Sequence, residues 1–179
     1  ATGDMGELSS GAELTIEGNG KDFSGNGHKG VEVGSDSVLT LNGVKEITGW
    51  DPYAVDNNGT LNFDGLTGDE TTVLNSGING TGTTNISGNV EVGPNGSITQ
   101  DGLNVNSDGN LKVNAAALHI GDDGINNSGK LNLTGGDGAN PAVLDADIVG
   151  TGALTISEGS VKFTGNNLTQ GELGITENG

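Results

Sequence analysis

Residues 59–65 read Gly-Thr-Leu-Asn-Phe-Asp-Gly, and this short phrase decides how the chain folds. Leu61 and Phe63 alternate with polar residues, which is the period-two pattern of a strand that buries one face. Gly59 and Gly65 bracket the five residues, as the turns between short strands require. The phrase therefore predicts one short strand with two side chains directed into a core.

The same phrase recurs along the whole chain, with a further aliphatic residue six positions before most of its anchors. The eight anchors are Leu14, Leu39, Leu61, Thr84, Leu111, Leu131, Leu154 and Leu173. Successive anchors lie 19 to 27 residues apart. A β-meander would repeat every 8–12 residues and a propeller blade about every 40, so neither architecture fits. The spacing predicts an all-β fold, a single-stranded parallel β-helix (β-solenoid) of seven to eight coils over residues 1–179.

Each coil is long enough for three short strands. After Leu154-x-Ile156 we expect the next strands at Val161-x-Phe163 and Leu168; the matching stretches after Leu111-x-Val113 are Leu118-x-Ile120 and Ile125. Equivalent aliphatic side chains of successive coils should stack in columns about 4.8 Å apart. We further hypothesise that stacked asparagine side chains hydrogen-bond between coils.

The composition limits both the core and the partners. The chain has 35 glycines, is 31% hydrophobic and 3% aromatic, and contains no cysteine, so the core must be narrow and lacks disulfides and cysteine-bound metals. The formal net charge is −18, which argues against nucleic acid and anionic membranes as partners. The longest apolar run, residues 115–118, is too short to insert in a membrane, and no signal peptide is recognised.

The repeated phrase, the Asn-Gly turns and the stretch 152–166 (Gly-Ala-Leu-Thr-Ile-Ser-Glu-Gly-Ser-Val-Lys-Phe-Thr-Gly-Asn) resemble the passenger domains of bacterial autotransporters and related β-helical surface adhesins. The resemblance implies a right-handed coil and a location outside the cell, on the bacterial surface. It also implies a non-enzymatic scaffold for cell adhesion, which presents loops to a protein or glycan of a host, a matrix or another cell. Because the membrane barrel of that family is absent here, we expect a segment of a longer surface protein or a differently built relative.

Parallel β-helices also include pectinase-like enzymes that act on polysaccharides, which is the alternative from another functional class. Asp122-Asp123, within Gly-Asp-Asp-Gly, resembles the paired carboxylates of polygalacturonases, and His28 faintly resembles their histidine. The order of the two along the chain is reversed, and no Arg-x-Lys pair is present for an acidic sugar. We therefore expect no catalytic residues and no enzymatic activity.

Two sets of residues are candidates for binding. The insertion at residues 44–54 holds Trp50 and Tyr53, which suit either a sugar ring or a protein partner, or else cover the side of the core. Weak calcium binding is the only cofactor hypothesis, and its candidate ligands are Asp122, Asp123, Asp145 and Asp147. Residues 18–30 are expected to form a flexible loop, and His119 to have a structural role within a strand.

Neither end of the repeat carries a recognisable cap. Solenoids need caps because a bare terminal coil exposes unpaired backbone and apolar side chains. Two explanations stay open: the segment belongs to a longer solenoid, or copies of the chain stack end to end as subunits of an extracellular filament.

Overall fold

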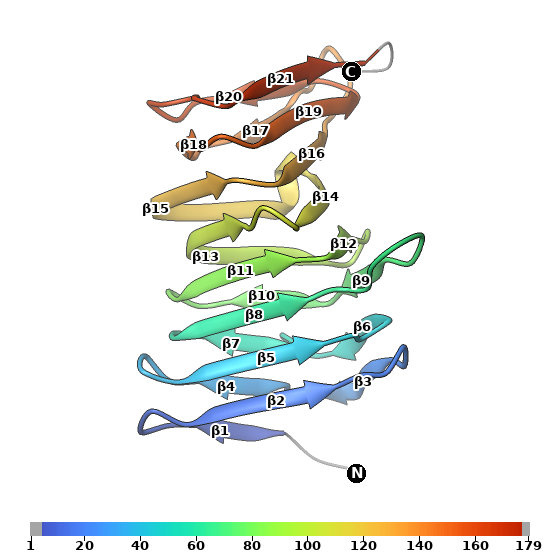
Figure 1. Cartoon of the computed structure of the whole chain (residues 1–179), viewed down its shortest axis with the longest axis vertical. Helices are drawn as coiled ribbons and strands as arrows, with labels where there is room; N and C mark the ends of the chain where they lie inside the picture. Colours follow the sequence, from blue (N-terminus) through green and yellow to red (C-terminus); the bar gives the residue numbers. More distant parts are fainter. Residues whose placement is uncertain (1–4, 177–179) are drawn as a thin grey trace.

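The computed structural model describes residues 5–176, which form an all-β solenoid of about 8 turns with parallel strand pairing. The predicted fold class is therefore confirmed. In Figure 1 the face that contains β5 (Val38–Asn42) runs along the front of the stack. The face that contains β7 (Val55–Asn57) returns behind it as the chain rises, so the coil is right-handed, as the resemblance implied.

Each coil contributes strands to three faces, which we number in chain order. The first face contains β1 (Gly6–Leu8), β4 (Val31–Val33), β7, β10 (Gly77–Asn79), the first halves of β13 (Ser97–Val105) and β15 (Leu118–Asn127), β17 (Ala142–Leu144) and β20 (Val161–Phe163). The second face contains β2 (Glu13–Glu17), β5, β8 (Thr60–Asp64), β11 (Thr83–Ser87), the second halves of β13 and β15, and β18 (Ile148–Val149). The third face contains β3 (Phe23–His28), β6 (Glu46–Trp50), β9 (Thr72–Asn75), β12 (Asn89–Val92), β14 (Asn110–Asn114), β16 (Lys130–Thr134), β19 (Ala153–Glu158) and β21 (Glu172–Ile175).

The core is a thin column of aliphatic side chains, as predicted, because strands such as β5, β8 and β11 direct alternate residues inward. Leu39 pairs with Leu61 in the next coil, and both side chains are fully buried. Phe63 lies beside Leu41 below it and Ile86 above it in a second buried column. The expected additional strands are also present, since Val161 and Phe163 lie in β20, Leu118 begins β15, and Leu168 forms a bridge with Ile148.

The predicted single column of anchors is wrong at its midpoint. Thr84 does not stack on Leu111; it pairs with Leu103 on the second face. Leu111 lies on the third face, where it pairs with Val90 and Leu131. The anchors therefore form two columns on different faces. The sequence pattern could not reveal this, because all three faces require the same alternation of apolar and polar residues.

A longer internal repeat explains this change of face. Gly59-x-Leu-Asn-x-x-Gly65 recurs at 129–135, Gly80-Thr-Gly82 at 150–152, and Thr99-Gln100 at 169–170, each 70 positions later. Leu61 lies on the second face, whereas its counterpart Leu131 lies on the third. Seventy residues therefore span three coils and one further face, so the second copy is rotated by one face about the solenoid axis.

Both copies of the 70-residue repeat form equivalent backbone hydrogen bonds at their corners. The amide of Gly82 donates to the carbonyl oxygen of Asn57 at 2.9 Å, and that of Gly152 donates to Asn127 at 2.9 Å. A Cβ atom at Gly82 would lie 2.3 Å from the carbonyl oxygen of Gly59. The glycine that lies two positions before six of the eight anchors (Gly59, Gly82, Gly109, Gly129, Gly152 and Gly171) is thus needed for close approach of the neighbouring coil, in addition to the predicted turn propensity.

Asparagine side chains tie successive coils together, as hypothesised. On the outer side of the second face, Asn104 donates to Asn85 Oδ1 at 2.7 Å, and Asn85 donates to Asn62 Oδ1 at 2.9 Å. Inside one corner, the buried Asn57 donates to Gln100 Oε1 at 2.5 Å, and the Gln100 amide returns a bond to the Asn57 carbonyl at 3.2 Å. The corner pair connects coils that are two turns apart and satisfies buried polar groups.

Two predicted loops are strands instead. Residues 18–30 contain β3, which pairs with β6, and β6 itself lies within the predicted insertion 44–54. Both contribute to the third face at the N-terminal end, where glycine-rich sequence hides the alternation. The short apolar run at residues 115–118 begins with a 3₁₀ turn, η1 (Ala115–Ala117), whose N-cap Asn114 accepts a hydrogen bond from the Ala116 amide.

The core columns make a direct prediction about stability. Leu61→Ala should lower the free energy of unfolding by about 2–5 kcal/mol, because it opens a cavity around a side chain with 0% exposure. Leu173→Ala is the matched control: its side chain occupies an equivalent inward position but is 58% exposed, so the loss should stay below about 1 kcal/mol. Urea denaturation followed by circular dichroism measures both, and equal losses would contradict the column assignment.

Candidate functional site

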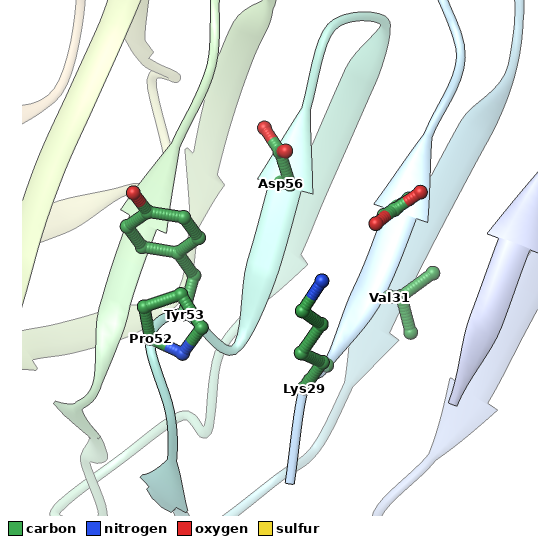
Figure 2. A pocket seen from close by; sticks show the side chains of 7 residues that line it. Lys29, Val31, Pro52, Tyr53 and Asp56 are labelled. Atoms are coloured by element: carbon green, nitrogen blue, oxygen red, sulfur yellow. The ribbon is translucent and has the colours of Figure 1, made fainter. Parts of the chain in front are cut away.

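Tyr53 stands beside a shallow hollow on the first face. The four-residue connection 51–54 joins β6 to β7, and its last residue, Ala54, is fully buried and donates its amide to the Gly77 carbonyl at 2.9 Å. The peptide bond between Asp51 and Pro52 is cis. The hollow is lined by Lys29, Gly30, Val31, Glu32, Pro52, Tyr53 and Asp56 (Figure 2).

Charged side chains line this hollow to one side of the Tyr53 ring (Figure 2). Glu32 of β4 pairs in register with Asp56 of β7, so two carboxylates stand one strand spacing apart on the outer surface. The Lys29 side chain rises between the two strands from below (Figure 2). An aromatic ring, two carboxylates and an ammonium group together provide a stacking surface, acceptors and a donor. These are the groups that bind a polyhydroxylated ring or a polar peptide.

The enclosed part of the hollow is small, about 60 Å³. This volume corresponds to roughly two water molecules, so the hollow does not enclose a ligand. A ligand would lie flat across Tyr53 and the carboxylates, on a surface that two paired strands hold in place.

Trp50, the other aromatic candidate, is packed against the protein. Its ring centre lies 4.7 Å from that of Phe23, and its indole Nε1 donates to the Phe23 carbonyl at 3.1 Å. The indole lies so close to β3 that a Cβ atom at Gly25 would come within 2.3 Å of it. The structure thus separates the two candidates: Trp50 covers the core, while Tyr53 faces the hollow. Binding by either residue stays a prediction.

The four aspartates suggested for calcium lie on one corner of two successive coils. Asp122 and Asp123 occupy the exposed bend of β15, and Asp145 and Asp147 follow β17 one coil later. Asp145 accepts a hydrogen bond from Thr164 Oγ1 at 2.9 Å, and Asp147 accepts from the amides of Asn166 and Asn167 at 2.6 and 3.0 Å. Within residues 5–176 no three His, Asp or Glu side chains lie close enough to hold a metal, so calcium binding stays a prediction without a formed site.

A larger groove, which the sequence did not indicate, opens on the first face across β13, β15 and β17. Its volume is about 450 Å³, and its walls include Thr99, Asp101, His119, Val143 and Asp145. His119, expected to be structural, points outward into this groove and is exposed. Only the tertiary structure brings these residues together, because they come from three successive coils.

The chain was compared with protein-family models, curated proteins and solved structures, and none of them matches it. In the part of the chain that the structure describes, no helix is long and apolar enough to cross a membrane.

The hydrogen bonds to the Asp147 carboxylate predict that its contribution to the stability of the fold depends on pH. Hydrogen bonds from the Asn167 side chain and from the Asn167 and Asn166 amides lower the pKa of its carboxyl group below the ordinary value of 3.8. A lowered pKa in the folded state stabilises the fold above pH 3.8, and this contribution disappears as the pH falls through the lowered value. The stability difference between wild type and Asp147→Asn should therefore shrink between pH 7 and pH 2.

Urea midpoints measured at both pH values test this prediction. Asp108→Asn, at an exposed position on a different corner, serves as the control for general loss of negative charge. A difference between wild type and Asp147→Asn that is the same at pH 7 and pH 2 would show that Asp147 does not act through its ionised form.

Proposed function

We propose that this chain is a non-enzymatic, extracellular surface scaffold, an adhesin-like segment that presents binding elements from the side of a β-solenoid. The observation that carries the proposal is the Tyr53 hollow, in which an aromatic ring, two carboxylates and a lysine stand on an outer face of paired strands. The partner is a glycan or a polar protein segment on a host, matrix or neighbouring cell.

The way the strands are joined supports this role. Glu32 and Asp56 sit on β4 and β7, which pair over three consecutive residues; on their other sides β4 pairs with β1 and β7 with β10. Their backbone positions are therefore fixed by hydrogen bonds on both edges, which reduces the ordering cost of binding. Tyr53 adds a large contact area with few rotatable bonds.

Replacing Tyr53 tests the proposal. Tyr53→Ala should weaken binding about three- to tenfold, because a ring-stacking contact contributes about 0.5–1.5 kcal/mol. Tyr53→Phe keeps the ring and should bind within about twofold of wild type. Fluorescently labelled chain applied to a glycan array and to fixed bacterial and animal cells measures the difference. Equal binding by Tyr53→Ala and wild type, or the absence of any binding, would refute the assignment of this hollow.

End-to-end self-association is a second candidate function, favoured by the two terminal coils. Leu173 and Ile175 of β21 are 58% and 67% exposed, although Leu173 pairs with the fully buried Leu154 one coil below. At the other end, Leu14 is 36% exposed below the fully buried Leu39 in the same column. A second copy stacked head to tail would cover these side chains and pair the free strand edges.

Charged substitutions at one end test the stacking. Leu173→Lys combined with Ile175→Lys should abolish concentration-dependent assembly, because the lysines would have to be buried between two coils. Val149→Lys is the control, since Val149 is 42% exposed but lies on the side of the stack. Analytical ultracentrifugation up to millimolar concentration gives the result, and a wild-type chain that stays monomeric throughout would eliminate this candidate.

A further inference from the structure

The first face is interrupted at one place, between β15 and β17. Leu118, His119 and Ile120 of β15 pair downward with Ile98, Thr99 and Gln100. β17 pairs upward with β20 through all three of its residues. Within residues 5–176, β15 and β17 are not paired with each other, so the upper edge of residues 118–120 has no strand partner.

The internal repeat shows what is missing from this gap. β9 is the counterpart of β17 seventy residues earlier, and β9 pairs on both sides, with β6 below and β12 above. Seventy positions after residues 46–48 of β6 lie residues 116–118, which belong to η1 and the first residue of β15. β17 consequently lies against η1, and a 3₁₀ turn offers no edge for a strand to pair with.

The gap opens into the groove of about 450 Å³ described above, which also extends below β15 over Thr99 and Asp101 of β13 and over Gly80 and Thr81. Gly121 and His119 of β15 line it together with Val143 of β17, and 49% of the Val143 surface is exposed. Asp101 and Asp145 line the same groove, both exposed, and Asp122 and Asp123 follow directly after Gly121. The groove therefore combines a free backbone edge, one apolar side chain and a negative rim.

We propose that this groove binds an extended, basic segment of a partner protein, which adds a strand along the Leu118–Ile120 edge. Backbone hydrogen bonds to the edge would supply affinity independent of sequence, and alternate side chains would meet Val143 on one side and the aspartates on the other. A second copy of the chain is disfavoured as the occupant, because its six lysines are outweighed by 24 acidic residues. The inference goes beyond the proposed function and does not depend on the Tyr53 hollow.

A synthetic peptide, acetyl-Lys-Val-Lys-Val-Lys-Val-amide, is a suitable probe. We expect saturable binding to the complete chain, with chemical-shift changes in ¹H–¹⁵N NMR spectra confined to residues 118–121 and 142–145. Amide exchange at residues 118–121 should slow about tenfold or more on saturation, because free edge amides gain partners. Exchange at residues 72–75 of β9, which is already paired on both edges, should not change.

Two controls separate strand addition from simple attraction between charges. The same peptide with N-methyl groups on alternate residues keeps its charge but loses the backbone N–H donors along one of its edges. Its binding should therefore weaken at least about tenfold. Asp101→Asn with Asp145→Asn should weaken binding of the unmodified peptide about three- to tenfold, whereas Asp64→Asn with Asp108→Asn, away from the groove, should leave it within about twofold. Equal binding of the methylated peptide, equal effects of the two double variants, or shifts spread over all faces would overturn the proposal.

Discussion

The whole molecule depends on the fact that one coil cannot bury its own apolar side chains. Leu39 and Leu61 are buried from solvent only because the parallel strand pairing places them one strand spacing apart, with further coils above and below. Apart from the gap over η1, interior coils are covered on both sides and the terminal coils are not, which is why Leu173 stays exposed while Leu154 beneath it is buried. Stability is thus a sum over neighbours along the axis, and the corner pair of Asn57 and Gln100 extends that coupling across two turns.

The same ladder determines where interaction surfaces arise. Where pairing is complete, as between β4 and β7, it fixes Glu32 and Asp56 at one strand spacing beside Tyr53. Where pairing fails, backbone edges and inward-facing side chains become accessible. The chain shows this at the two terminal coils and at the gap over η1, so a single 3₁₀ turn produces the largest side opening among the grooves described here.

Predictions from the sequence succeeded for features that repeat and failed for features that do not. Alternation around Leu61, Leu131 and Leu154 correctly placed three buried strands. The strands β3 and β6 were missed because Gly25 and Gly49 interrupt their alternation, and structure there comes from pairing with the neighbouring coil. Among the site candidates, Trp50 and Tyr53 are only three residues apart, yet one packs on Phe23 and the other faces a hollow, which no sequence pattern distinguishes.

The sequence alone determined that the chain is a parallel solenoid with a thin aliphatic core, because a local alternation bracketed by glycines needs only short-range geometry to become a strand. It also determined the length of a coil, since the anchor spacing excludes other repeat architectures. Only the tertiary structure decided which face each phrase occupies, because the three faces impose the same alternation and the 70-residue repeat rotates from one to the next. Only the tertiary structure likewise determined the groove at His119 and Val143, because this groove depends on the absence of pairing between β15 and β17, which belong to different coils.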